Sequence, residues 1–260
     1  MKKALLLTLI VLAATSFASP IRASIASRLT GSSSSEEPFS FPYVSSGLVA
    51  MWDGIWNVGI GEHGSDANAW KDIVSGEDTS LPDLVSVLDN GVYFNDNGSI
   101  SWMLTPPLAE ALKSANITIE MCISIVPYNR VQYRTILGTS GLGNDIYIYT
   151  PRGISTTQSY IFYNYYGRAS SVDSILDSNG CFLGTIALVC DVSSLMGRRY
   201  TNGRNTSRAT YSQIPSTMPT VMLSSLMTGA VIYSVRIYSR PLTADEVAWN
   251  SDVDKERFGL

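Results

Sequence analysis

The chain has 260 residues, of which 45% are hydrophobic and 15% charged, and its formal net charge at pH 7 is −4. This is the composition of an ordinary globular protein, and it lacks the basic excess that nucleic-acid binding requires. The length accommodates one large all-β domain or two small ones.

Residues 1–18 have the pattern of a secretory signal peptide. Two lysines follow the first methionine, residues 4–14 are apolar, and Ser16 and Ala18 form a small-x-small cleavage signal of bacterial type. The apolar run is too short to cross a hydrocarbon core of about 30 Å. The pattern predicts export to the periplasm, the cell surface or the medium, with no membrane span in the mature chain.

Residues 19–45 are rich in serine and proline without a sustained hydrophobic period, which predicts a flexible linker. From Gly47 onward, short β-branched and aromatic segments alternate with clusters of Gly, Asn, Asp and Pro, which is typical of strands and turns. Asn202 and Gly203 predict a hairpin turn because both residues tolerate positive φ. The predicted strand segments are 47–53, 91–96, 99–104, 116–126, 133–140, 145–150, 159–166, 181–193, 197–207, 220–226 and 229–239.

Two helices are predicted. Residues 106–114 begin with proline and continue with strong helix formers. Residues 243–250 begin with a Thr-x-x-Glu capping box, and Val247 and Trp249 are expected to pack this helix onto the strands. Many short strands with little helix indicate a single two-sheet antiparallel sandwich or a barrel.

Residues 229–259 resemble the last strand and helix of the concanavalin A-like lectin/glucanase superfamily, in particular the LamG-like jelly-roll domains of secreted bacterial proteins. The resemblance lies in "VRIYSR" followed by "LTADEVA". In the same order as in that family, "GLVAMWDG", "ITIEMCIS" and "RRYTNGR" resemble its first strand, central strand and Tyr-x-Asn-Gly hairpin. The resemblance implies an all-β, two-sheet antiparallel jelly-roll sandwich with short peripheral helices over residues 46–260. It leaves function open, because the superfamily contains both binding proteins and glycoside hydrolases.

A jelly-roll glycoside hydrolase needs two carboxyl groups close together, supplied from one strand. The run Asp252, Asp254 and Glu256 follows the predicted last helix and reads as a solvated polar tail. His63 has no partner motif and stands in a glycine-rich loop. The sequence therefore predicts a protein that is not an enzyme, with a hydrolase of unrecognised site as an alternative. The acids on the predicted strands have no acidic neighbour two residues away: Glu120, Asp145 and Asp191.

Residues 145–168 are rich in tyrosine, and aromatic faces stack on sugar rings. Strand alternation places Tyr160 and Tyr166 on one face and Tyr163 and Tyr165 on the other. One face must be core, and the other could line a ligand-binding sheet; the alternative is that tyrosine simply fills the sheet. The candidate ligand-binding residues are Tyr147, Tyr149, Tyr160, Tyr163, Tyr165 and Tyr166.

Residues 51–75 combine acids, asparagines and glycines, which could supply the oxygen ligands of Ca²⁺. A structural calcium ion is also what the LamG-like resemblance implies. The segment lacks EF-hand spacing, and the alternative is a long loop in which Trp56 and Trp70 pack over the sandwich while the acids face water. The candidate metal ligands are Asp53, Glu62, Asp66 and Asp72.

Three cysteines occur, at positions 122, 181 and 190. Cys122 alternates with the apolar residues of its strand and therefore faces away from them. Cys181–Cys190 is the more plausible pair, but no disulfide is expected, because a chain of this length can build a core without one.

We expect a secreted, non-catalytic module that binds a glycan or glycosylated surface. The alternative is an adhesive or structural module that recognises protein through an apolar patch.

Overall fold

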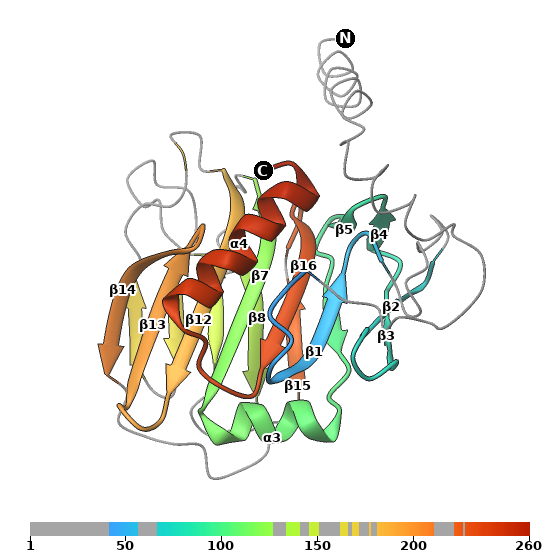
Figure 1. Cartoon of the computed structure of the whole chain (residues 1–260). Helices are drawn as coiled ribbons and strands as arrows, with labels where there is room; N and C mark the ends of the chain where they lie inside the picture. Colours follow the sequence, from blue (N-terminus) through green and yellow to red (C-terminus); the bar gives the residue numbers. More distant parts are fainter. Residues whose placement is uncertain are drawn as a thin grey trace, which may run out of the picture. The chain divides into compact units, whose positions relative to one another are not determined.

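A computed structural model describes residues 42–56, 67–126, 134–140, 146–150, 162–165, 168–171, 177, 181–210, 221–225 and 227–260. The elements below all lie within one compact unit, Phe41–Phe258. Antiparallel strands dominate it, in two stacked sheets, so the predicted all-β jelly-roll sandwich with short peripheral helices is confirmed (Figure 1).

The larger sheet contains eight strands in the described part of the chain. β1 (Leu48–Asp53) pairs with β16 beside the main path of strands. The order along that path is β14 (Arg204–Thr210), β13 (Met196–Thr201), β12 (Phe182–Asp191), β7 (Ile117–Ile125), β16 (Val231–Tyr238), β5 (Gly91–Phe94) and β4 (Val85–Leu88).

The second sheet contains six strands among the described residues. A two-stranded ribbon of β2 (Ala69–Lys71) and β3 (Asp78–Ser80) forms a separate small sheet that contacts β6. The short β2, β3, β4 and β11 were not predicted, because their three or four residues give too little alternation to detect. The order in the second sheet is β11 (Arg168–Ser171), β10 (Phe162–Tyr165), β9 (Tyr147–Thr150), β8 (Arg134–Ser140), β15 (Val221–Ser225) and β6 (Ile100–Trp102).

The core lies between the two sheets and follows from strand alternation. On β7, every second residue from Ile117 to Ile125 is buried in it, and Cys122 lies on the opposite face, as predicted. Three tryptophans meet in the same core: the ring centroids of Trp52 and Trp102 are 4.9 Å apart, and those of Trp70 and Trp102 are 5.6 Å apart. Each of the three indole N–H groups donates a hydrogen bond, so none of these large side chains is buried with an unpaired donor.

Helix α3 (Pro106–Ser114) matches its predicted bounds and closes one end of the sandwich (Figure 1). Its apolar side chains, including Leu108 and Leu112, are buried. The helix ends at Ala115, whose φ of 56° is left-handed. In the β13–β14 hairpin, Asn202 and Gly203 have φ of 49° and 76°, which confirms the predicted turn.

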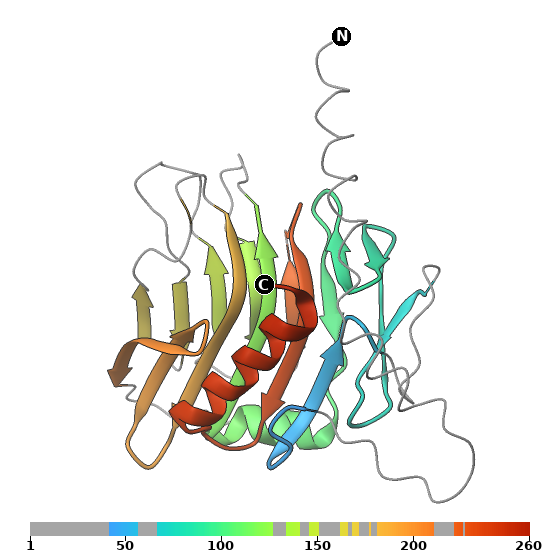
Figure 2. The ribbon, with the colours of Figure 1, turned by 45° about the horizontal axis from the view of Figure 1, so that its top comes forward.

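Helix α4 (Ala244–Phe258) lies on the outer face of the larger sheet (Figures 1 and 2). Its capping box is confirmed: the Thr243 N–H donates to Glu246 Oε2 at 2.8 Å, and the Glu246 N–H donates to Thr243 Oγ1 at 3.2 Å. The helix extends eight residues beyond the predicted end at 250, so the predicted polar tail was wrong. Val247 is buried as expected, whereas the side of the helix that carries Trp249 faces solvent, with that residue 58% exposed.

The helix was missed beyond residue 250 because its buried face is largely polar. Val247, Asn250, Asp254 and Phe258 follow one another at spacings of three and four, the spacing of a single helix face. An alternating pattern of acids had suggested a solvated segment instead.

In the described part of the chain, no helix has the length and hydrophobicity to cross a membrane.

Candidate functional site

The tyrosine-rich strands β9 and β10 lie side by side in the six-stranded sheet. Ile148 of β9 is buried in the core and pairs in register with Tyr163 of β10. Tyr147 and Tyr149 occupy the alternate positions of β9, opposite Asn164 and Phe162.

Paired residues of an antiparallel ladder share a sheet face, so the register divides the predicted tyrosine set. Tyr147 and Tyr149 take positions on the outer face of the sheet. Tyr163, and Tyr165 two residues later, take positions on the core face. A ligand platform on this sheet would therefore use the β9 pair. Tyr160 and Tyr166 lie outside the described residues.

Of the predicted metal ligands, Asp53 is fully buried at the end of β1. Its Oδ1 accepts hydrogen bonds from the N–H groups of Ile55 and Trp56, both at 3.0 Å, and from Arg257 Nη2 at 2.9 Å. Its Oδ2 accepts a further bond from Arg257 Nη1. Asp53 thus forms the turn after β1 and pairs with the end of α4.

Asp72 is also buried, just after β2. Its Oδ1 accepts the N–H of Met51 at 2.8 Å and that of Val74 at 3.0 Å, and its Oδ2 accepts the hydroxyl of Ser75 at 2.6 Å. The expectation that the acids of this segment face water was wrong for Asp53 and Asp72. Trp70 does anchor the segment: its Nε1–H donates to the carbonyl of Asp53 at 2.9 Å.

The structure thus gives both described candidate ligands protein partners. Glu62 and Asp66 lie outside the described residues, so calcium binding there stays a prediction. Among the residues that are described, no group of three or more His, Cys, Asp or Glu side chains is placed to bind a metal ion.

All three cysteines are free thiols, Cys122 and Cys190 buried and Cys181 half-buried.

A cluster of charged side chains, absent from the sequence predictions, lies between α4 and the larger sheet. Arg236 of β16 donates from Nη1 to Asp254 Oδ1 at 2.8 Å, from Nη2 to Asp254 Oδ2 at 2.7 Å, and from Nε to Glu120 Oε2 at 3.1 Å. Glu120 Oε2 also accepts the Asn250 side-chain amide at 2.7 Å. All four side chains are fully buried.

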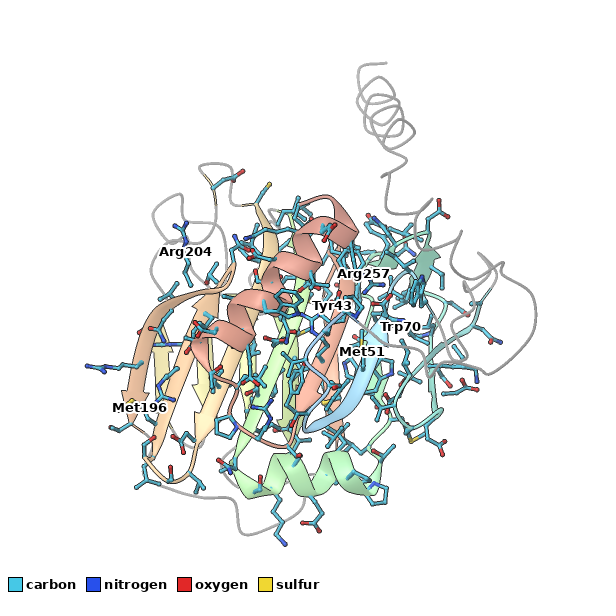
Figure 3. The ribbon with its side chains drawn as sticks, in the orientation of Figure 1. Tyr43, Met51, Trp70, Met196, Arg204 and Arg257 are labelled. Atoms are coloured by element: carbon cyan, nitrogen blue, oxygen red, sulfur yellow. The ribbon has the colours of Figure 1, made fainter. Side chains whose placement is uncertain are left out.

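Tyr43, from the segment before β1, continues this cluster. Its hydroxyl donates to Asp254 Oδ1 at 2.8 Å and accepts from Arg257 Nη1 at 2.8 Å. The guanidinium carbon of Arg236 lies 4.1 Å from the centre of the Tyr43 ring, a cation–π distance. Figure 3 shows Tyr43 and Arg257 together beside α4. Through these contacts, one cluster joins α4 to β7, β16, β1 and the N-terminal segment.

The cluster contains three carboxyl groups, those of Asp53, Glu120 and Asp254, and two guanidinium groups, those of Arg236 and Arg257. Full ionisation would leave a buried excess of one negative charge, which is costly. Of the three carboxyl groups, that of Glu120 accepts the fewest hydrogen bonds, because its Oε1 has no hydrogen-bond partner among the described residues. Burial raises the pKa of Glu120 to about 7, against the opposing attraction of Arg236.

Glu120 and Asp254 both accept hydrogen bonds from Arg236, yet they do not resemble the acid pair of a glycoside hydrolase. Both are fully buried beneath α4, and Asp254 is saturated by donors from Tyr43, Thr185 and Arg236. The ion pairs and hydrogen bonds of these side chains attach α4 to the larger sheet. No single element of the sequence carries the pattern of this arrangement, because Glu120 and Asp254 come from β7 and α4.

No protein-family model matches the chain, and no curated protein matches it significantly. Solved structures do resemble it. Trypanosoma rangeli sialidase in complex with sialic acid is similar with a TM-score of 0.60 and 16% identity, over 91% of this chain and 38% of that one. Another T. rangeli sialidase structure gives 0.59 and 15%, over 81% of this chain and 33% of that one.

A structure titled HCR/D F1240A mutant gives a TM-score of 0.60 and 12% identity, over 80% of this chain and 51% of that one. The chain thus spans between a third and about half of the proteins that it resembles. At these identities the likeness establishes the fold alone. That fold is an antiparallel β-sandwich.

Proposed function

We propose that the protein is a non-catalytic carbohydrate-binding module with a LamG-like, concanavalin A-like sandwich. The observation that carries the proposal is the match of this sandwich, over 91% of the chain, to a sialidase solved with sialic acid. The buried state of Glu120 and Asp254 supports a binding role over a hydrolytic one, because no substrate can contact these two acids beneath α4.

The outer face of the six-stranded sheet is the glycan-binding surface in this proposal. Helix α4 covers the other sheet and α3 lies at one end, so neither described helix occupies this face (Figure 2). Tyr147 and Tyr149 take register positions on it. Two aromatic residues at alternate positions of one strand are spaced to stack on neighbouring sugar units.

The proposal includes export, which rests on the signal-peptide pattern of residues 1–18. It also includes a structural Ca²⁺ ion at Glu62 and Asp66. Asp53 and Asp72 would support that site indirectly, by fixing the ends of the segment in which the two ligands lie.

A glycan array probed with the purified chain tests the proposal. We expect retention on a defined set of glycans and its loss in Tyr147→Ala/Tyr149→Ala. Tyr93→Ala is the matched control, because Tyr93 is a half-buried tyrosine of the larger sheet. A chain that is folded by circular dichroism but binds no glycan would overturn the proposal. Binding to protein ligands alone would favour the adhesive alternative.

A further inference from the structure

The β13–β14 hairpin is a strongly basic element on an acidic chain. Residues 196–210 contain four arginines and no acid, whereas the whole chain has a net charge of −4. Arg199 belongs to the interior: it is buried, pairs in register with the core residue Leu188, and donates a hydrogen bond to Ser207 Oγ. The other arginines of the hairpin need a separate explanation.

Arg198 and Arg208 stand directly opposite each other in the β13–β14 ladder. Arg198 also pairs in register with Val189, whose side chain packs with Val247 of α4, so both arginines lie on the outer face of the larger sheet. Arg198 is half-buried and Arg208 is exposed. Neither forms a hydrogen bond or ion pair with another described residue.

Like charges directly opposite each other on two strands are destabilising. The acid of β12 on this face does not relieve the repulsion. Asp191, opposite Met196, accepts the hydroxyls of Ser193 and Ser194 at 2.6 and 2.8 Å, and hydrogen bonding within that turn lowers its pKa. The two arginines therefore occupy directly opposite positions of the ladder without a counter-charge from the described residues.

We propose that Arg198 and Arg208 form a second site, on the opposite sheet from Tyr147 and Tyr149, that binds the carboxylate or sulfate group of an acidic glycan, an inference that rests on the proposed carbohydrate-binding function. Guanidinium groups from two opposite positions of a ladder can offer planar forks of N–H donors to one anion, and these forks match the oxygens of either group. The bound anion replaces a repulsion with two ion pairs. Arg208 is exposed and Arg198 is half-buried, so an anion can approach Arg208 from solvent, whereas the turn of the hairpin packs against α4, where Gly203 lies against Ala248.

A different explanation for the arginines is protection of the sheet edge. β14 is the last strand of the larger sheet, and charged side chains on edge strands prevent pairing with other chains. That role predicts aggregation when the charges are removed, and no response to anions. Anion binding predicts a soluble variant with a changed ligand preference, so one pair of substitutions distinguishes the two.

The test compares the parent chain with Arg198→Gln/Arg208→Gln in titrations against sialyllactose, a sulfated disaccharide and neutral lactose. We expect the double variant to lose about tenfold or more in affinity for whichever acidic sugar the parent prefers, with lactose binding unchanged. Arg204→Gln is the matched control. Arg204 is on the same hairpin but pairs with Thr201, on the face opposite to Arg198. The preferred acidic sugar identifies the anion as carboxylate or sulfate.

A second measurement uses the free protein. Without an anion, Arg208→Gln should raise the melting temperature, because it removes a repulsion. Inorganic sulfate should raise the melting temperature of the parent more than that of the double variant.

Equal affinity of the parent for acidic and neutral sugars, or unchanged acidic-sugar affinity in the double variant, would overturn the inference and leave the proposed function standing. If no sugar binds at all, the proposed function fails and an acidic-glycan role fails with it. The sulfate measurement then shows whether an anion site exists in its own right. Aggregation of the double variant with an unchanged sulfate response would assign the arginines to edge protection.

Discussion

Arg236 of β16 and Asp254 of α4 form a two-pronged ion pair, with Nη1–Oδ1 and Nη2–Oδ2 distances of 2.8 and 2.7 Å, and both side chains are fully buried. Burial makes this pair costly unless every group is satisfied. Thr185 and Tyr43 supply further donors to Asp254. The last helix is therefore attached to the sheet by a polar cluster as well as by apolar contacts.

Asp254→Ala should lower the free energy of unfolding by about 3–5 kcal/mol, because it leaves the buried Arg236 guanidinium without its main partner. Asp252→Ala, on the exposed side of the same helix, removes only a surface ion pair with Lys255 and should change stability little. Urea unfolding of both variants measures the difference. Equal effects of the two substitutions would contradict the role of the Arg236–Asp254 pair.

Glu120 should make stability depend on pH. Its pKa is raised on folding from 4.5 to about 7, so between these values the folded chain binds more protons than the unfolded chain. The contribution of Glu120 is fully present below about pH 4.5, declines as the pH rises toward 7, and stays lost above it. Glu120→Gln removes the group, so the difference in unfolding free energy between variant and parent should change across this range. A difference that is constant from pH 4.5 to 8 would contradict this assignment.

Trp70 and Trp249 offer a matched comparison, because each indole donates to a backbone carbonyl, at 2.9 and 2.8 Å. They differ in burial, at 1% and 58% exposed. Trp70→Ala should cost about 3–5 kcal/mol of stability, because it empties part of the core. Trp249→Ala should cost far less. Chemical denaturation measures both, and a larger loss for Trp249 would show that the outer side of α4 is covered in solution.

The cysteines should differ in reactivity toward an alkylating reagent. Cys122 and Cys190 are buried, and burial raises the pKa of both thiols. Cys181 is partly exposed, so it should be modified in the native state while the other two react only after unfolding. Mass spectrometry with and without denaturant counts the modified thiols. Rapid modification of Cys190 in the native protein would contradict the packing of β12.

Calcium should raise the melting temperature if Glu62 and Asp66 bind it as proposed, and a chelator should reverse the shift. Glu62→Gln/Asp66→Asn should abolish the response. Asp245→Asn is a suitable control, because Asp245 is an exposed acid on α4, far along the chain from the proposed ligands. A melting temperature unaffected by calcium and chelator would contradict the proposed site.

The sequence by itself determined the local structure of this protein. Alternation of apolar residues identified β7 and β12, the Asn202-Gly203 pair identified the turn between β13 and β14, and the proline start identified α3. These features depend on neighbours within a few residues, where backbone sterics and side-chain spacing decide the conformation. The short strands β2 and β3 were missed because three residues carry too little pattern.

Only the tertiary structure decided what the polar residues do. Asp254 belongs to a run of acids that looks solvated, yet it is buried, because a helix face with spacing of three and four carries it onto Arg236. Tyr163 and Tyr147 looked equivalent as strand aromatics, and the β9–β10 register places them on opposite faces. Strand pairing and helix docking join residues that are distant along the chain, so the partner of a charge or an aromatic ring is fixed by packing and cannot be read from its sequence neighbours.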